Sequence, residues 1–127
     1  MPLRGINHIT FCVRDLDRAI AFYSDTLGGV VRHQWARGAY LDIGGLWVCL
    51  ELADTVSPRD DDSHTAFDCD AADFATLAAR ISASSTHWKD NRSEGASLYF
   101  LDPDGHKLEL HVGSLQDRLS HYERTKP

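Results

Sequence analysis

Three residues whose side chains bind divalent metals lie in β-rich stretches of the sequence. His8 opens the stretch HITF, His64 opens the similar stretch HTAF, and Glu109 lies close to the end of the last apolar run. Two neutral imidazoles and one carboxylate on rigid strands supply three ligands and leave other coordination positions open. The pattern therefore predicts a catalytic divalent-metal site rather than a closed structural one.

Because the stretches around His8 and His64 resemble each other, the two halves of the chain predict a fourth position for a ligand. That position, in the first half of the chain, is Cys49 or Glu51, depending on how the turn is aligned. We leave both out of the predicted set, because a missing fourth protein ligand frees a coordination site for substrate. His111 shares the strand face of Glu109 and could support the ligands. The remaining histidines are interpreted as surface or turn residues: His33, His87, His106 and His121.

A second group of chemically active residues lies in the stretch WKDNRSEGASLYF, residues 88–100. This stretch places a lysine, an asparagine, an arginine, two serines and a glutamate just before an apolar strand. It is not a phosphate-binding P-loop, because the Gly-Lys-Ser/Thr ending is absent. Such a density of donors and acceptors favours a ligand-binding loop over an ordinary surface turn, although a polar turn that caps backbone groups remains the simpler alternative.

The elements that must position these residues form a repeated pattern. A β-rich run, a helical run that begins after Asp15, and three short β-like runs are followed by a similar series in the second half. The segment GAYLDIGGLWVCLEL also resembles GASLYFLDPDGHKLEL. The sequence predicts an α+β fold of paired βαβββ modules at about 5–52 and 64–112, with a linker at 53–63 and a polar tail at 113–127 that could form a short helix.

Side chains alternate between the two faces of a strand, so each predicted strand can be divided into two sets. One set is aliphatic and suits packing beneath a helix. The other set carries His, Thr, Tyr, Trp, Ser or Glu, and it includes Tyr40 and Trp47, which are predicted to line a substrate site. Curled mixed sheets with such a face would form a cup around the metal. A face that simply contacts solvent is the alternative.

Composition limits the remaining function classes. The net charge of -6 argues against nucleic acid or an anionic membrane as the main partner. No apolar run approaches the roughly 18 residues that span a bilayer, and the first residues lack the apolar segment of a signal peptide. The three cysteines, Cys12, Cys49 and Cys69, favour reduced thiols and a cytoplasmic location.

These residues together resemble the fosfomycin-resistance glutathione transferases of the vicinal oxygen chelate superfamily, which also includes glyoxalases, bleomycin-resistance proteins and dioxygenases. The resemblance extends from INHITF to about LQDRL and is most specific in WKDNRSEGASLYFLDPDGHKLELHVG. The paired modules are typical of the whole superfamily, whereas the NRSEG loop is typical of this activity. The resemblance implies addition of glutathione to the epoxide of fosfomycin, which inactivates the antibiotic.

The resemblance also implies cofactors, partners and residue roles. It implies a homodimer in which manganese(II) is held by His8, His64 and Glu109, with one histidine from the partner subunit, and in which Thr10 lies near the epoxide. It implies a potassium ion in the NRSEGAS loop, where Glu94 supplies negative charge close to the ion. The implied contacts of the phosphonate are Lys89, Ser93, Ser97, Tyr99 and Arg118, and those of potassium are Asn91, Ser93, Gly95 and Ser97.

The sequence differs from the family pattern at two positions. Asp62 and Thr65 stand where the family usually has aromatic residues beside the second metal histidine. This difference changes the polarity of one wall of the pocket. Three other functions stay open: an epoxide hydrolase that uses water, a metal-dependent dioxygenase of the same superfamily, and a metal-free drug-binding protein similar to bleomycin-resistance proteins.

Overall fold

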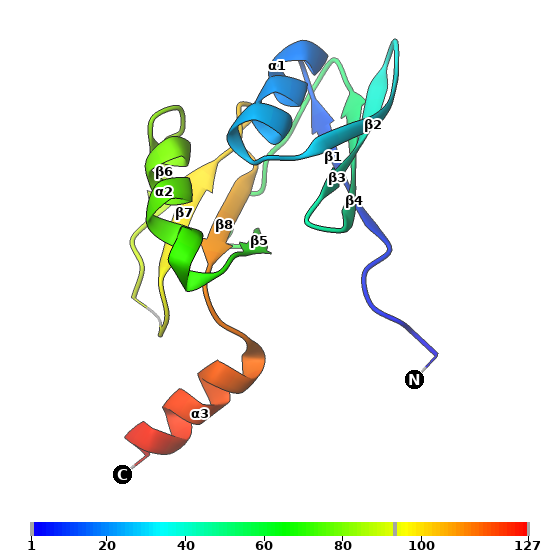
Figure 1. The fold of residues 1–127 in the computed structure, drawn as a ribbon. Coiled ribbons are helices and arrows are strands. Elements are labelled where there is room, and N and C mark those ends of the chain that lie inside the picture. The colour runs from blue at the N-terminus through cyan, green and yellow to red at the C-terminus, as the bar shows by residue number, and fades with distance from the viewer. Residues whose placement is uncertain (1, 93, 127) are drawn as a thin grey trace. The chain divides into compact units, whose positions relative to one another are not determined.

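The computed structural model of the chain describes residues 2–92 and 94–126. It contains two compact units, residues 1–58 and 59–127. The boundary between the units lies inside the polar, Pro-containing stretch 53–63. Each unit has its own sheet and its own helix against that sheet (Figure 1).

The first unit is a four-stranded mixed sheet with one covering helix. The strand order is β1-β4-β3-β2, with β1 parallel to β4 and the other neighbours antiparallel. Helix α1 continues into a π-helical turn, η1, before the chain enters β2. The bounds are β1 His8–Val13, α1 Leu16–Ala21, η1 Phe22–Thr26, β2 Val30–Trp35, β3 Gly38–Ile43 and β4 Leu46–Leu52.

The second unit repeats this plan. Its strand order is β5-β8-β7-β6, again with a parallel pair, β5 and β8, at one edge. The bounds are β5 Thr65–Asp68, α2 Ala71–Ser82, β6 His87–Lys89, β7 Ser97–Leu101, β8 Lys107–His111 and α3 Leu115–Thr125. The predicted α+β class with two mixed sheets is therefore confirmed.

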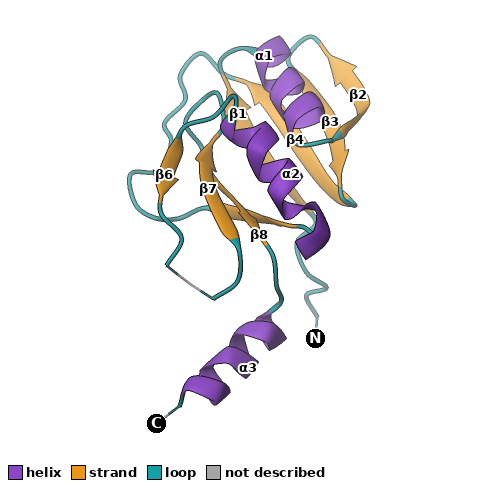
Figure 2. Ribbon diagram, turned by 60° about the vertical axis from the view of Figure 1, so that its left-hand side comes forward, coloured by secondary structure: helices purple, strands orange, loops and turns teal. Residues whose placement is uncertain are grey.

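The alternation of side chains explains why each sheet has one apolar face. In the first unit Val13, Leu41, Val48 and Leu50 are completely or almost completely buried, and so is Tyr23 from η1, whose ring stacks on that of Phe11. The second unit has an equivalent set in Ile81, Phe100 and Leu108. Figure 2 shows α1 lying across the sheet of β1 to β4 and α2 lying across the sheet that contains β7 and β8. The opposite face of each sheet is left for polar and aromatic side chains.

Local sequence signals account for the helix ends. The Asp15 carboxylate accepts a hydrogen bond from the Arg18 backbone N–H at 3.0 Å, which confirms the predicted N-cap. At the start of α3, Ser114 and Asp117 form a reciprocal capping box. The backbone and side-chain hydrogen bonds from Ser114 lower the pKa of the Asp117 carboxyl group. The predicted polar tail is thus a well-capped helix.

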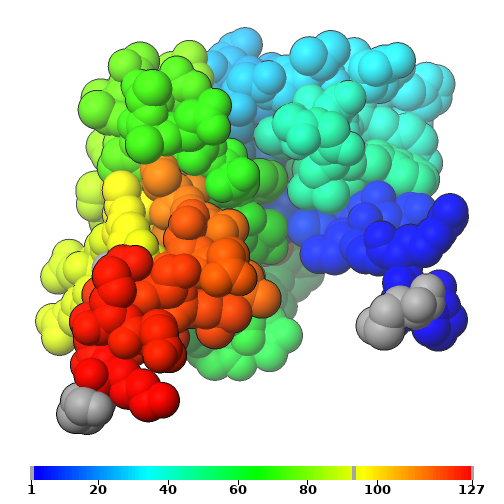
Figure 3. Space-filling view, turned by 60° about the horizontal axis from the view of Figure 1, so that its bottom comes forward, coloured from blue at the N-terminus to red at the C-terminus, as the bar shows by residue number. Residues whose placement is uncertain are grey.

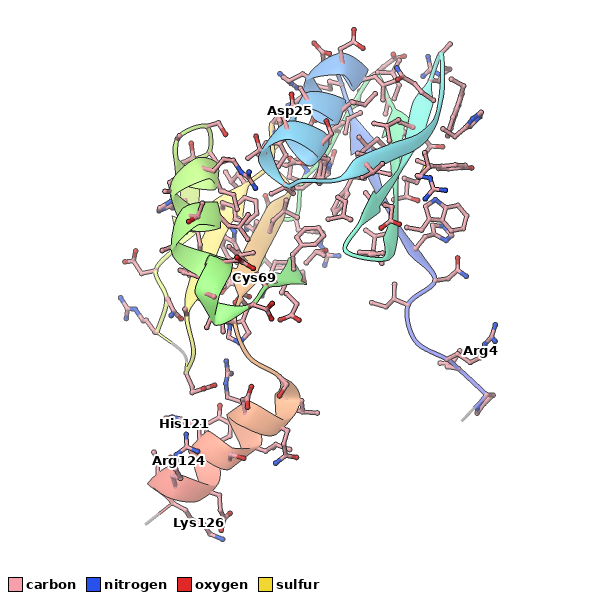
Figure 4. The ribbon with its side chains drawn as sticks, in the orientation of Figure 1. Arg4, Asp25, Cys69, His121, Arg124 and Lys126 are labelled. Atoms are coloured by element: carbon pink, nitrogen blue, oxygen red, sulfur yellow. The ribbon has the colours of Figure 1, made fainter. Side chains whose placement is uncertain are left out.

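Helix α3 projects from the end of β8 and contains no fully buried residue. Figure 3 shows α3 in red, continuing from the orange residues of β8, and in Figure 4 His121 and Arg124 lie toward the far end of the helix, with Lys126 directly after it. None of the helices in the described part of the chain combines the length and the apolar character needed to cross a bilayer.

Candidate metal and anion site

The polar face of the second sheet is centred on a buried carboxylate. Glu109 lies in the middle of β8 and is only 6% exposed. One of its oxygens, Oε2, accepts a hydrogen bond of 2.6 Å from the Ser97 hydroxyl group, and the other, Oε1, lies 2.8 Å from Nε2 of His64. Burying a charged carboxylate is costly unless positive charge or hydrogen-bond donors compensate it. The surroundings of Glu109 are arranged to provide that compensation.

The hydrogen bonds of His64 point its second ring nitrogen at Glu109. Its Nδ1 lies 2.7 Å from the backbone carbonyl oxygen of Asp62. Because a carbonyl oxygen only accepts, Nδ1 carries a proton and donates it. In the neutral ring, Nε2 then presents a lone pair to a carboxylate oxygen at 2.8 Å. Such a pair of acceptors needs a proton or a cation beside it, so an imidazole nitrogen and a carboxylate here fit a divalent first-row metal ion.

Aromatic rings hold the His64 imidazole in place. The ring centroid of Trp88 lies 5.4 Å from that of His64, and the ring centroid of Tyr99 lies 5.8 Å away. Trp88 is itself fixed, because its indole N–H donates to the Leu108 carbonyl oxygen at 3.0 Å. Trp88 has no role among the residues predicted from the sequence. Its position next to Lys89, in the middle of a short strand, was the available signal.

His111 supports Glu109 through Ser97. The serine hydroxyl has one proton, which it donates to Glu109, so the hydrogen bond between Ser97 Oγ and His111 Nδ1 has the histidine as donor. Nδ1 of His111 also lies 3.4 Å from Glu109 Oε2. His111 thus contacts both Ser97 and the predicted ligand Glu109, and its supporting role at a metal stays a prediction. Ser97, which the resemblance assigns to phosphonate and potassium, contacts the predicted metal ligand directly in this structure.

A pocket of about 360 Å³ opens beside this pair of predicted ligands. Its wall carries two cationic groups, each of which has an acidic neighbour. Nζ of Lys89 lies 3.7 Å from an Asp62 carboxylate oxygen and 5.4 Å from the centroid of the Tyr99 ring. The pocket is lined by His64, Ala66, Lys89, Tyr99, Glu109, His111 and Arg118. Most of the predicted phosphonate contacts thus gather around one cavity.

The second cation, Arg118, reaches from α3 to the polar loop. Its guanidinium group donates to the Glu94 side chain at 3.4 Å and to the Glu94 backbone carbonyl oxygen at 3.2 Å. Hydrogen bonds to Tyr122 and to Glu94 raise the pKa of Arg118, so the group stays positively charged. Glu94, for which the resemblance implies a place beside potassium, is thus paired with Arg118 in the structure.

The loop that precedes β7 turns at Gly95, whose φ of +84° suits glycine. A side chain at this position would collide with the Val112 carbonyl oxygen, 2.7 Å from the site of a Cβ atom. The Asn91 amide group donates to the Gly95 carbonyl oxygen at 2.9 Å and closes the loop. Two predicted potassium contacts, Asn91 and Gly95, are therefore neighbours. Ser93 lies outside the described residues.

The polar face of the first sheet carries the remaining predicted site residues. The ring of His8, an exposed residue, lies 4.3 Å from the ring of Trp47, and its Nδ1 lies 2.7 Å from the side-chain oxygen of Asn7. Since that oxygen accepts, Nε2 of His8 is left with a lone pair. Tyr40 packs edge-on against Trp47, with 5.2 Å between ring centroids. The face therefore presents an imidazole nitrogen next to an aromatic surface.

Thr10 lies on the same face, two residues after His8. It pairs with Cys49 across β1 and β4. Burial raises the pKa of the Cys49 thiol, and a hydrogen bond with Thr10 partly opposes that change. All three cysteines of the chain are free thiols, as the sequence predicted.

Each unit supplies only part of the predicted ligand set. His64 and Glu109 belong to the second unit, and His8 belongs to the first. Within residues 2–92 and 94–126, no three His, Cys, Asp or Glu side chains are grouped closely enough to hold a metal ion. The second unit thus offers a pair of ligands, and the first unit offers an exposed imidazole.

Comparison with known proteins places this arrangement in a family. Residues 5–110 match the model of the Glyoxalase/Bleomycin resistance protein/Dioxygenase superfamily. The chain is 50% identical over 123 residues to the glutathione transferase FosA of Serratia marcescens, covering 93% of this chain and 87% of that protein. It is 37% identical to the metallothiol transferase FosB of Staphylococcus epidermidis, covering 98% of this chain and 95% of that one.

The fold agrees with this relationship. A solved structure of the fosfomycin resistance protein FosX from Listeria monocytogenes, in complex with Mn(II) and a sulfate ion, superimposes with a TM-score of 0.81 at 31% identity. The match covers 94% of this chain and 98% of that chain. The chain therefore belongs to the Glyoxalase/Bleomycin resistance protein/Dioxygenase superfamily and, within it, to the fosfomycin-resistance proteins.

Proposed function

We propose that this protein is a metal-dependent transferase that adds glutathione to the epoxide of fosfomycin and so inactivates the antibiotic. The observation that carries the proposal is the pairing of His64 Nε2 with the buried Glu109 carboxylate, beside a pocket lined by Lys89 and Arg118. A metal ligand pair next to two cations suits a substrate with a phosphonate and a nearby electrophilic oxygen. The 50% identity to a glutathione transferase supports the choice of thiol.

We assign the metal site to His8, His64 and Glu109, with manganese(II) as the preferred ion. The protein acts as a homodimer in this proposal, and one of the two histidines comes from the second copy. The exposed position of His8 leaves it accessible to such a partner. A bound divalent ion would supply Lewis-acid stabilisation of the negative charge that develops on the epoxide oxygen. The two modules, at about 5–52 and 64–112, work as a single domain.

The chain's own side chains orient and neutralise the substrate. Lys89 and Arg118 provide charged donors for the phosphonate oxygens, and the hydroxyl groups of Ser93, Ser97 and Tyr99 provide neutral ones. These two cations lie on the wall of one pocket in a chain whose net charge is -6, although each also has an acidic neighbour. Thr10 lies near the epoxide oxygen or the incoming sulfur, and the aromatic surface of Tyr40 and Trp47 lines the approach. A thiol cosubstrate and three free cysteines suit a reducing compartment such as the cytoplasm.

We propose a potassium ion in the loop around Gly95, held by oxygen atoms of Asn91, Ser93, Gly95 and Ser97. Backbone carbonyl and hydroxyl oxygens are suitable ligands for this large, weakly hydrated cation. At constant ionic strength, replacing sodium by potassium is expected to raise the rate by at least about twofold. Steady-state rates in the two chlorides would measure this. A rate that does not depend on which ion is present would remove the cation site from the proposal.

Asp62 is expected to weaken substrate binding through its contact with Lys89. Its carboxylate is 78% exposed and lies 3.7 Å from the Lys89 ammonium group. Exposed ion pairs contribute about 0.2–1 kcal/mol, so Asp62→Asn should lower the KM for fosfomycin by up to about fivefold at low salt. The backbone carbonyl that contacts His64 is retained in this variant. The effect should shrink as salt is added.

The control for this prediction is Asp54→Asn, which removes an exposed carboxylate from the first unit. It changes the net charge by the same amount without touching Lys89. Equal changes in KM for the two variants would show that only the overall charge matters, and that the contact between Asp62 and Lys89 has no specific effect.

The function itself is tested by turnover of fosfomycin with glutathione, cysteine or water, each with and without manganese. Analysis of the metal content of the purified protein separates a metalloenzyme from a metal-free drug-binding protein.

A further inference from the structure

Lys107 binds the backbone of an acidic segment that lies directly before His64. Its ammonium group donates to the carbonyl oxygen of Asp61 at 2.6 Å and to that of Asp60 at 3.2 Å. These contacts join β8 to a segment about 46 residues earlier in the chain. The acceptors are backbone carbonyl oxygens, so the interaction fixes the path of the chain rather than the position of an acidic side chain.

The same segment contains the hydrogen-bond partner of the predicted metal ligand. The Asp62 carbonyl oxygen, one residue after the Asp61 carbonyl, accepts from Nδ1 of His64 at 2.7 Å. Partners of this kind set the tautomer and the orientation of a ligating imidazole, and their loss typically reduces metal affinity by about 10–100-fold. The lysine and the histidine thus hold consecutive carbonyl groups of one short segment.

A turn gives this segment a defined shape between the two contacts. The Asp61 carboxylate accepts from the Ser63 backbone N–H at 3.0 Å. Hydrogen bonds from Ser63, together with one from Arg59, hold the pKa of Asp61 at about 2, so the carboxylate is charged at neutral pH. The turn makes residues 61–63 a compact link between Lys107 and His64.

A second contact joins Lys107 to the surroundings of His64. The Lys107 ammonium group lies 5.4 Å from the centroid of the Trp88 ring, and the Trp88 ring in turn packs against the His64 imidazole. Lys107 also precedes Glu109 by two residues on β8, so both side chains start from the same face of the strand. One lysine is therefore connected to the backbone and the ring that orient His64.

We infer that Lys107 is a positioning residue of the metal site, which acts by fixing the carbonyl group of Asp62 and hence the Nε2 orientation of His64. This inference rests on the proposed function, because it takes His64 to be a metal ligand. Lys107 itself touches neither metal nor substrate in this account. Its effect reaches the site through backbone segment 60–62.

The test compares manganese affinities of purified variants, measured from the electron paramagnetic resonance signal of free Mn²⁺. Lys107→Met keeps the apolar stem over Trp88 and removes the donors, and it should weaken manganese binding by about 10-fold or more. Lys107→Arg keeps a cation that can donate to both carbonyl oxygens and should stay within about threefold of the wild type. If arginine restores the manganese affinity, the loss in Lys107→Met results from the missing hydrogen-bond donors and not from a general disturbance of the fold.

Arg59→Ala is the matched control. Arg59 belongs to the same segment, but its guanidinium group donates to the exposed Asp61 side chain at 3.0 Å, and its removal leaves in place the Ser63 N–H bond that forms the turn and the carbonyl groups that Lys107 binds. The manganese affinity of Arg59→Ala should equal that of the wild type. If circular dichroism shows that Lys107→Met does not fold, Lys107→Gln replaces it. This variant should bind manganese more weakly than the wild type and Arg59→Ala, with a loss of up to about 10-fold.

Two outcomes would overturn the inference, and each differs from a failure of the proposed function. Folded Lys107→Met that binds manganese as tightly as the wild type would show that Lys107 does not position His64. An equal loss of affinity in Lys107→Arg would show that donation to the carbonyl oxygens is not the cause. A wild-type protein that binds no manganese would instead contradict the metal site itself.

Discussion

Replacing Glu109 by glutamine is expected to lower both the manganese affinity and the rate of thiol addition by at least about 100-fold, because loss of a ligand should cost more than the about 10–100-fold that loss of a residue supporting a ligand costs. The substitution keeps the shape of the side chain and its hydrogen bond from Ser97, but it removes the negative charge. An amide oxygen is a weaker ligand, and Nε2 of His64 would no longer face a carboxylate oxygen at 2.8 Å. Manganese titration and steady-state kinetics of the purified variant measure the two effects.

The repeat in the chain supplies the control. Glu51 lies in the Leu-Glu-Leu segment of β4, as Glu109 does in that of β8, but Glu51 is exposed whereas Glu109 is buried. In the strand register Glu51 pairs with Gly38, whereas Glu109 pairs with Tyr99, so Cys49, which pairs with Tyr40, is the positional counterpart of Glu109. Glu51→Gln should keep the metal affinity and rate of the wild type. A Glu109→Gln protein with full metal content and full rate would show that the metal ligand has been assigned wrongly.

Glu109→Gln should leave the metal-free protein folded. Removing a buried charge also removes the cost of desolvating it, so the free energy of unfolding of the metal-free variant is expected to stay within about 1–2 kcal/mol of the wild-type value. This makes the variant a specific probe of the site, since a loss of activity would not result from a loss of the fold.

The repeat made the fold predictable from the sequence. The two stretches HITF and HTAF each open a strand that leads into a helix, and the alternation of aliphatic with polar residues indicated which face of each sheet is buried. In the structure Leu108 and Leu110 are buried on one side of β8, while Glu109 joins His64 and Ser97 on the other. Periodicity was sufficient here because the strands are regular.

The hydrogen bonds around the site could not be predicted in the same way. The partner of His64 is a backbone carbonyl oxygen, and any residue type at position 62 provides one, so the sequence carries no signal for it. The contact between Lys107 and Asp61 joins residues 46 positions apart through a loop without regular spacing. The pairing of Arg118 with Glu94 could not be predicted either, because it depends on the direction that the chain takes between β8 and α3.

The mass of the product shows whether the protein joins a thiol to fosfomycin. The purified protein is incubated with fosfomycin, manganese and either glutathione or water alone. We expect a product whose mass is the sum of fosfomycin and glutathione, because addition opens the epoxide without a leaving group. Removing the metal with a chelator should abolish this product, and manganese should restore it.

Other masses would contradict the account. A product heavier than fosfomycin by one water, formed without thiol, would identify the protein as an epoxide hydrolase. Unchanged fosfomycin together with a protein that contains no metal would identify a drug-binding protein of the same fold. Only the glutathione adduct, formed in a metal-dependent reaction, agrees with a transferase built on His8, His64 and Glu109.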